Sequence, residues 1–319
     1  MERDYTIHMK LDILIATYNR CELLGRALRS LLDSSVPPGA EVCVTVIDNN
    51  STDATRQVVE GWMPAFGGRL RYLFEKNQGK SWALNSGIAA TSGDLLGIID
   101  DDEEIDPNWF VCCFSAFADP AVDFIGGTTL PNWSQPPPVW LPSRYRAVVG
   151  QCQICSEKRQ YGPALDAVLA GGNAVIRRSF LDKLGSSPYS TKLGRIGRGL
   201  LAADTMFFEH LLEAGGRGFY IPDLMVRHYV QPNMLTKRYH RRWCFWEAAS
   251  LAFQDKLKPS SDVHLLGIPR WHFRMSLMGL ARWARGLVLP GARPEVAFSG
   301  QLDFVRLLGF LYGRHIFRP

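Results

Sequence analysis

The first hundred residues alternate between strand-like and helix-like patterns, and this alternation restricts the possible folds more than any other feature of the sequence. Short apolar runs rich in β-formers are each followed by a segment that repeats apolar residues at helical spacing. The pattern predicts strands at 11–16, 42–47, 70–74 and 95–99, and helices at 21–32, 55–62 and 80–90. Such alternation is typical of an α/β fold with a mostly parallel central sheet flanked by helices.

Polar residues directly follow three of these strands. The segments are Thr17-Tyr18-Asn19, Asp48-Asn49-Asn50 and Asp100-Asp101-Asp102. In parallel sheets, ligands bind beyond the carboxyl ends of the strands. Ordinary solvated loops are the alternative explanation, but they would scatter acids over both ends of the strands. We therefore expect one ligand site at a single edge of the sheet.

The third segment belongs to the run GIIDDDEE, residues 97–104, which sets a strand against five consecutive acids. Two unit charges about 5 Å apart repel by roughly 3 kcal/mol at an effective dielectric constant of 20, so either water or a cation must offset the repulsion. Clustered carboxylates suit Mg²⁺ or Mn²⁺, which are usually shared with substrate phosphates. Because the sequence has neither G-x-x-x-x-G-K-[ST] nor G-x-G-x-x-G, it does not indicate a P-loop or dinucleotide-binding enzyme. The run favours a divalent cation and a diphosphate ligand.

Charge divides the chain into an acidic part and a basic part. Residues 231–319 contain 14 Lys/Arg and 5 Asp/Glu, whereas residues 1–230 contain 22 and 26. In the basic part Arg, Trp and Leu interleave at roughly helical spacing, which is typical of helices on anionic membrane surfaces. A helical subdomain docked on the acidic part is an equally good interpretation, and the two are compatible. We do not expect nucleic acid as a partner.

Cysteine usage and hydropathy bear on the compartment. The seven cysteines are odd in number in a long chain, which favours a reducing compartment. Cys152 and Cys155 have C-x-x-C spacing, but no second pair or nearby histidine completes a zinc site. The N-terminal residues lack the apolar segment of a signal peptide, and no apolar run reaches the ~18 residues that span a bilayer. We expect a cytoplasmic protein, with the inner face of the membrane as a further location.

Five segments carry a family resemblance: ILIATYNR, VIDNNSTD, NQGKSWALNSGIAATSGDLLGIIDDD, GGNAVIRR and AADTMFFEHLLEAGGRGFYIPDLMVRHYV. In order and spacing they resemble the family 2 glycosyltransferases of GT-A fold. That family transfers a sugar from a nucleotide-diphosphate donor, usually with Mg²⁺ or Mn²⁺ on a D-x-D motif. The resemblance implies a GT-A catalytic domain at 1–230 and a basic, aromatic-rich helical extension at 231–319, on the acceptor or membrane-surface side.

The resemblance also implies which residues contact the nucleotide sugar. Ala16 and Tyr18 would line the nucleobase pocket, and Asp48 would hydrogen-bond the base. The ribose, diphosphate and sugar would meet residues from further along the chain: Lys80, Asp100, Asp101 and Asn173.

The same resemblance implies a site for Mn²⁺ or Mg²⁺. Asp102 would ligate the ion, with Asp100 beside it. His228 follows two short strands predicted at 218–221 and 224–226. It would reach the ion or the diphosphate, whereas a packed or surface histidine is the alternative. We expect Glu103 and Glu104 to be solvated or to lie behind the ligands.

Asp204 occupies the position of the family's E-D motif, at the start of a helix predicted at 203–212. The helix dipole would keep its carboxylate ionised, ready to accept a proton from an acceptor hydroxyl. The residue before it is Ala203, where the family commonly has an acid, so Asp204 is the one base candidate on that turn. A helix-capping role is the alternative. One displacement, with charge on the departing diphosphate taken up by the metal and by Lys/Arg partners, would invert the anomeric configuration.

Other enzyme classes fit the sequence less well. A nucleotidyltransferase would carry a Gly-rich, basic loop after the first strand, and ATYNRCE is not one. A degenerate GT-A domain acting only as a binding module would not need Asp100, Asp102 and Asp204. Arg242-Trp243 resembles part of the Q-x-x-R-W motif of processive synthases, but Tyr239 replaces the glutamine. We expect a transferase for polysaccharide or glycolipid assembly, with a sugar or lipid-linked acceptor.

Overall fold

The computed structural model describes residues 8–162, 165, 168–191, 203–257, 262–289 and 291–317. They form two compact units. The first contains the described residues of 1–130, 152–194 and 203–229, and the second contains those of 131–151 and 230–319. Each unit has its own buried apolar clusters.

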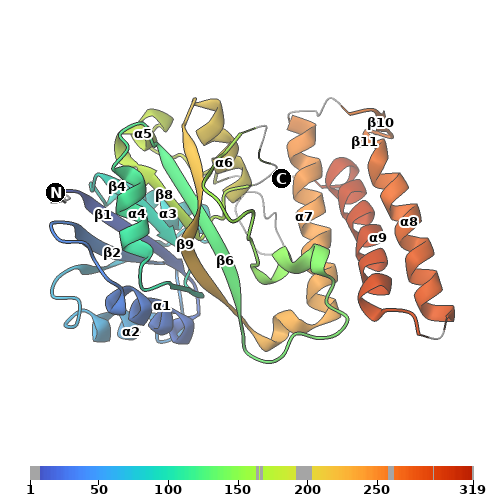
Figure 1. The fold of residues 1–319 in the computed structure, drawn as a ribbon, viewed down its shortest axis with the longest axis horizontal. Coiled ribbons are helices and arrows are strands. Elements are labelled where there is room, and N and C mark those ends of the chain that lie inside the picture. The colour runs from blue at the N-terminus through green and yellow to red at the C-terminus, as the bar shows by residue number, and fades with distance from the viewer. Residues whose placement is uncertain are drawn as a thin grey trace. The chain divides into compact units, whose positions relative to one another are not determined.

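The first unit is built on a sheet to which the described residues contribute nine strands, in the order β3-β2-β1-β4-β8-β6-β9-β5, with β7 paired to β9 (Figure 1). The neighbours β3, β2, β1 and β4 run parallel, whereas β8 and the strands beyond it pair antiparallel. The strands are β1 (Lys10–Thr17), β2 (Glu41–Asp48), β3 (Leu70–Phe74), β4 (Leu95–Ile99), β5 (Glu103–Ile105), β6 (Phe124–Trp133), β7 (Arg159–Gln160), β8 (Asn173–Arg177) and β9 (Gly218–Val230). The predicted α/β fold with a flanked central sheet is confirmed.

Four helices of this unit begin and end close to the predicted positions: α1 (Cys21–Asp33), α2 (Thr55–Trp62), α3 (Lys80–Ala89) and α6 (Ala203–Glu213). The unit also contains α4 (Trp109–Phe117), α5 (Arg178–Leu181) and a 3₁₀ turn η2 (Asp182–Leu184). One local prediction was wrong: the two short strands expected at 218–221 and 224–226 are the single strand β9. Pro222 lies within this strand although it lacks an N–H, and its carbonyl accepts a hydrogen bond from the Thr128 hydroxyl at 2.8 Å.

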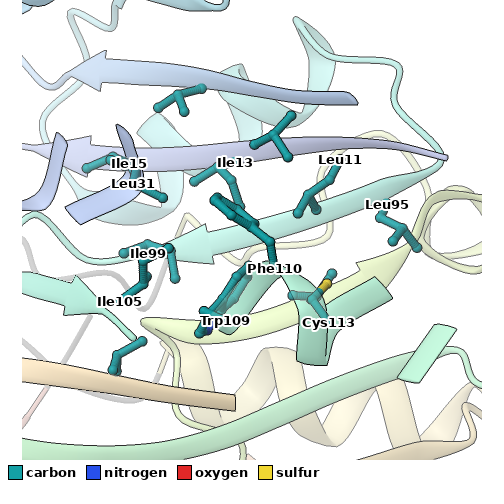
Figure 2. Close-up of a cluster of buried hydrophobic side chains, with 14 of the residues drawn as sticks. Leu11, Ile13, Ile15, Leu31, Leu95, Ile99, Ile105, Trp109, Phe110 and Cys113 are labelled. Carbon is teal, nitrogen blue, oxygen red and sulfur yellow. The ribbon is translucent and has the colours of Figure 1, made fainter. Parts of the chain in front are cut away.

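The sheet buries both of its faces. One face packs against α1, α2 and α4, and the other packs against α3, α5 and α6. Successive residues of β1 alternate between the two clusters, with Ile13 in the first and Leu14 in the second. Figure 2 shows Trp109 and Phe110 of α4 in the first cluster, beside the apolar side chains of β1 and β4. The rings of Trp109 and Phe110 meet edge to face with centroids 5.4 Å apart.

The strand register brings the polar residues together at one edge. Thr17 at the end of β1 lies opposite Asp48 at the end of β2, and Ile99 at the end of β4 lies opposite Asn173. After a tight turn at 100–102 the chain enters β5, where Glu103 lies opposite His228 of β9. The long strand β9 therefore carries His228 to the acid run.

The second unit is helical, which confirms the predicted C-terminal helical extension. Its long helices are α7 (Lys237–Leu257), α8 (Arg270–Val288) and α9 (Pro294–His315), with α9 between the other two (Figure 1). Shorter elements are the 3₁₀ turns η1 (Ser143–Val149) and η3 (Pro232–Leu235) and the hairpin of β10 (His264–Leu265) and β11 (Ile268–Pro269). In the part of the chain that the structure describes, no helix has the length and apolarity to cross a bilayer.

Two features join the helices of the second unit. A Cβ at Gly279 of α8 would lie 2.7 Å from the carbonyl oxygen of Gly300 on α9, so the two glycines permit a close helix contact. Asp303 of α9 is buried and accepts hydrogen bonds from Arg144 at 3.0 Å, Tyr145 at 2.6 Å and Arg282 at 2.6 Å. Because both guanidinium groups and the phenol contact one carboxylate, Asp303 ties η1, α8 and α9 together.

Candidate active site

The acid run lies mostly inside the protein. Asp101, Asp102 and Glu103 are buried, whereas Asp100 and Glu104 are partly exposed. Of the two positions expected for Glu103, solvated or behind the ligands, its burial excludes the solvated one, because β5 pairs with β9 and turns this side chain inward. Glu104 forms an ion pair with Arg26 and lines a cavity of about 450 Å³ together with Arg29 and Trp62.

The chain supplies its own cations to the acids. Arg20, between β1 and α1, places Nη1 2.8 Å from Asp101 Oδ1 and 2.7 Å from Asp102 Oδ2. The Thr17 hydroxyl donates to Asp101 Oδ2 at 2.8 Å. The sequence analysis did not single out Arg20, although it follows the first polar segment directly. The positive charge of Arg20 offsets part of the repulsion among the five adjacent acids.

Lys80, at the start of α3, joins the acid run to the candidate base. Its Nζ lies 2.6 Å from Asp100 Oδ1 and 3.7 Å from Asp204 Oδ2. Burial opposes its charge, but Asp100 and Asp204 outweigh burial and raise the pKa of Lys80 above its usual range. Lys80 is therefore a fixed cation between two carboxylates.

Hydrogen bonds from Asn49, at the end of β2, position Lys80. The Asn49 side chain accepts from the N–H of Gly79 at 2.6 Å and donates to the carbonyl of Asn77 at 2.7 Å. Gly79 has φ = 137°, a conformation that residues with a side chain rarely adopt. The loop that leads into α3 is thus held to the end of β2, which places Lys80 beside the acids.

Asp204 lies in the first turn of α6, with 36% of its side chain exposed. Its Oδ1 is buried and has no hydrogen-bond partner among the described residues. Gly171 and Gly172 leave the space for this arrangement, because a Cβ at Gly171 would lie 2.6 Å from Asp204 Oδ1 and one at Gly172 would lie 2.8 Å from Asp100 Cγ. The Gly-Gly pair lets the chain pass directly against both carboxylates.

His228 and Asp102 form a further ion pair, with Nε2 and Oδ2 3.6 Å apart. Burial opposes the charge of His228, but Asp102 outweighs it and raises the pKa of His228 to about 9. Burial likewise opposes the charge of Asp102, but the hydrogen bond from His228 and the charge of Arg20 lower its pKa. Burial raises the pKa of Glu103, and the neighbouring Asp100 adds to this effect.

The residues expected around the nucleobase lie at the ends of β1 and β2. Tyr18 is exposed and Ala16 is half-buried. Asp48 is buried and accepts hydrogen bonds from the N–H of Ser51 at 2.8 Å and from the Tyr72 hydroxyl at 2.7 Å. Burial and Asp48 raise the pKa of Tyr72 to about 12. Tyr72, on β3, is a second residue that the sequence analysis missed.

Asn173 lies at the same edge, but its side chain is buried and its hydrogen-bonding groups are used within the protein. Oδ1 accepts from the Trp109 indole at 2.9 Å, and Nδ2 donates to the carbonyls of Leu224 at 2.8 Å and Thr128 at 3.2 Å. The structure does not bring this amide to the carboxylates. It links α4, β6 and β9 beneath them.

The donor atoms at this edge are of the kind that a hard divalent cation binds: carboxylate oxygens and an imidazole. Among the described residues no group of three or more His, Cys, Asp or Glu is arranged to hold a metal ion. Asp102 and His228 are close enough to bind the same metal ion, and Asp100 is two residues from Asp102. An ion bound here would displace the proton of His228, since an imidazole ligates metals in its neutral form.

Fold and sequence comparisons identify the class. The structure resembles that of a mannosyltransferase, PcManGT from Pyrobaculum calidifontis in complex with GDP-Man and Mn²⁺, with a TM-score of 0.64 and 17% identity over 96% of this chain and 88% of that one. The fold is that of the GT-A glycosyltransferases, and the protein is a glycosyltransferase. Residues 12–185 match the family described as glycosyl transferase family 2, and the chain belongs to this family.

Two curated relatives are similar over most of the chain. The succinoglycan biosynthesis protein ExoM of Rhizobium meliloti is 29% identical over 72% of this chain and 69% of its own length. A glucosyl-dolichyl phosphate glucuronosyltransferase of Haloferax volcanii is 25% identical over 80% of each chain. The predicted family, fold and enzyme class are confirmed.

Proposed function

We propose that the protein transfers a sugar from a nucleotide-diphosphate donor to an acceptor hydroxyl by a single displacement that inverts the anomeric carbon. The observation that carries this proposal is the position of Lys80, 2.6 Å from Asp100 and 3.7 Å from Asp204. The Lys80 side chain therefore lies between the candidate base Asp204 and Asp100 of the acid run, which would contact the donor.

Asp204 is the proposed general base. It is partly exposed, so an acceptor can reach it, and its Oδ1 has no hydrogen-bond partner among the described residues. It lies in the first turn of α6, at the positive end of the helix dipole. An acceptor hydroxyl that donates to this carboxylate gains nucleophilicity as it attacks.

The nucleotide would lie along the ends of β1, β2 and β4. Ala16 and Tyr18 would line the pocket of the base, and Asp48, held by Tyr72 and Ser51, would accept a hydrogen bond from it. The sugar-phosphate end would lie near Lys80 of α3 and near Asp100 and Asp101 of the acid run, with Asn173 of β8 packed beneath them.

Mn²⁺ or Mg²⁺ is the proposed cofactor, held by Asp102, Asp100 and His228. When bound, the ion would stabilise negative charge on the departing diphosphate. Arg20 would keep Asp101 and Asp102 in place, because it contacts both. Lys80 would orient Asp100 and Asp204 on the two sides of the donor sugar.

The acceptor is proposed to be a sugar or a lipid-linked sugar in polysaccharide or glycolipid assembly. The names of the two relatives support this: one concerns succinoglycan and the other a dolichyl phosphate. We propose residues 1–230 as the catalytic domain and 231–319 as the acceptor or membrane side of a cytoplasmic enzyme at the inner face of the membrane.

Calorimetric titration with UDP, GDP and dTDP, with and without Mn²⁺, tests the donor half of the proposal. We expect one nucleotide to bind, and to bind more tightly with Mn²⁺. The matching nucleotide sugars are then tested for transfer, with NMR of the product to determine the anomeric configuration. The proposal fails if none of the nucleotides binds in any condition or if the product retains the donor configuration.

Asp204→Asn tests the base. The variant should bind the donor with unchanged affinity and transfer at least 100-fold more slowly, since general-base catalysis contributes about 10²–10⁴-fold. Asp33→Asn is the matched control, because Asp33 is an exposed carboxylate at the end of α1. Equal transfer by the wild type and Asp204→Asn would exclude Asp204 as the base.

A further inference from the structure

One face of α8 is exposed and combines arginines with apolar side chains. Positions 270, 274, 277, 281, 285 and 288 recur at helical spacing, and all six residues are exposed. We call these six, with the adjoining Trp271 and Met278, the outer face of α8: Arg270, Trp271, Arg274, Leu277, Met278, Ala281, Arg285 and Val288. Leu277 and Val288 are 68% and 78% exposed.

The opposite face of α8 is used for packing. His272, Ser276 and Gly279 are buried, and Arg282 donates to Asp303 of α9 at 2.6 Å. Since α9 lies between α7 and α8, α8 is at the margin of the three helices (Figure 1). The outer face therefore takes no part in holding the three helices together.

The outer face is positively charged without compensation from its own helix. α8 contains four arginines and no Asp or Glu. Among the described residues, the ion pairs of α8 involve Arg282 alone, so Arg270, Arg274 and Arg285 carry their charge to the surface. Asp262 lies at the rim, where its Oδ2 accepts from the Trp271 indole at 3.2 Å.

Exposed apolar residues continue beyond both ends of the helix. Leu265 of β10 and Leu266 of the turn after it are exposed in the hairpin that precedes α8. Leu287 and Leu289 are exposed where α8 ends. A 19-residue helix is about 28 Å long, so arginine and apolar surface extend along its whole length.

We propose that the outer face of α8 binds the surface of an anionic lipid bilayer. Leu277, Met278 and Val288 would enter the boundary of the acyl chains while the arginines reach lipid phosphates, because arginine side chains extend an apolar stem and a charged tip. Trp271 at the rim suits the membrane–water interface. A second copy of the chain is a poorer occupant, since two such faces would set arginines against arginines. This inference rests on the proposed membrane side of residues 231–319 and assigns it to one helix face; it does not depend on the transfer reaction.

Co-sedimentation of the full chain with vesicles tests the proposal. We expect binding to vesicles of phosphatidylcholine that contain about 30% phosphatidylglycerol, because this anionic lipid gives the vesicles a negative surface potential. Binding to phosphatidylcholine alone should be weak. The triple variant Arg270→Gln/Arg274→Gln/Arg285→Gln should lose about fivefold in affinity per arginine, about a hundredfold in total. Leu277→Gln/Val288→Gln should also weaken binding and should leave its salt dependence unchanged.

Matched controls separate this face from the net charge of the chain. Arg29→Gln/Arg71→Gln/Arg159→Gln removes the same charge from exposed positions of the first unit, and Val36→Gln/Val139→Gln replaces exposed apolar residues elsewhere. Both controls should bind anionic vesicles within twofold of the wild type. Nucleotide titration of every variant keeps a failure here distinct from a failure of the proposed function.

Three results would overturn the proposal. The first is no binding of the wild type to anionic vesicles. The second is equal loss in the control and outer-face arginine variants. The third is a dimer, measured by light scattering, that the outer-face substitutions dissociate, because a second copy would then be the occupant.

Discussion

Arg20→Met would remove the cation that two buried carboxylates share. The Asp101 and Asp102 side chains are 6% and 8% exposed, and Nη1 of Arg20 lies 2.8 and 2.7 Å from them. Removal of one partner from a buried ion pair costs about 3–5 kcal/mol. Because the Arg20 side chain is 36% exposed, water replaces part of the lost interaction, and we expect a loss of about 2–4 kcal/mol.

Hydrogen exchange with mass spectrometry measures this loss in the first unit alone. In protein without metal or nucleotide, amides of β1 and β4 should exchange about 30- to 700-fold faster in Arg20→Met, which is 2–4 kcal/mol of local opening energy. Peptides from α9 in the second unit provide the internal reference.

Two further variants test the cause. Arg20→Lys keeps the charge but replaces the planar guanidinium with a compact ammonium on a more flexible stem, so its effect should be intermediate. Arg20→Met/Asp101→Asn should recover part of the loss, because the carboxylate left unpaired is gone. The reasoning is refuted if Arg20→Met changes the exchange of β1 less than fivefold, or if the two substitutions are additive.

Three further predictions concern the metal, the carboxylates and acid stability. Asp102→Ala should weaken nucleotide binding at least tenfold in Mn²⁺ and leave metal-free binding unchanged in calorimetry; equal manganese-dependent affinity would refute that ligand. Gly172→Ala should lower transfer at least tenfold because its Cβ would displace Asp100, whereas Gly61→Ala, with no atom within 4 Å of its Cβ, should be neutral in the same assay. Burial lowers the pKa of His240 to about 4, so below pH 6.5 the unfolded chain binds a proton that the folded chain excludes, and stability falls from pH 6.5 towards 4. His240→Phe should reduce that fall in urea titrations of the second unit at pH 7 and 5; an unchanged difference would contradict this assignment.

Local patterns predicted most of the first unit because its strands and helices carry clear apolar patterns. The residues of α2, β3 and β4 begin and end where these patterns placed them. Apolar residues run almost without a break along β1, because this strand is buried on both faces of the sheet. Helices and strands that depend mainly on local apolar patterns can thus be predicted from the sequence.

The antiparallel part was harder to predict because its partners are distant in the chain. β5 has three residues, two of them acids, and nothing local marks it as a buried strand. Its pairing with β9 joins Glu103 to His228, and that register decides the burial of Glu103.

Arg20 did leave a signal that could have been used. It stands at the N-cap of α1, where a helix dipole disfavours a cation, and its own side chain does not cap the helix. An arginine at such a position indicates an acidic partner elsewhere in the fold. The sequence could not say which acid, since Asp101 and Asp102 lie more than eighty residues away.

The hydrogen bonds of the Asn49 amide have a consequence for altering donor preference. Asn49 adjoins Asp48, the residue proposed to contact the nucleobase, and holds Gly79, the neighbour of Lys80, which lies beside the proposed base Asp204. A substitution at Asp48 that moves the end of β2 would therefore also move the ammonium group between Asp100 and Asp204. Exchanging the base specificity of this enzyme would therefore change turnover as well as affinity, and both ends would have to be redesigned together.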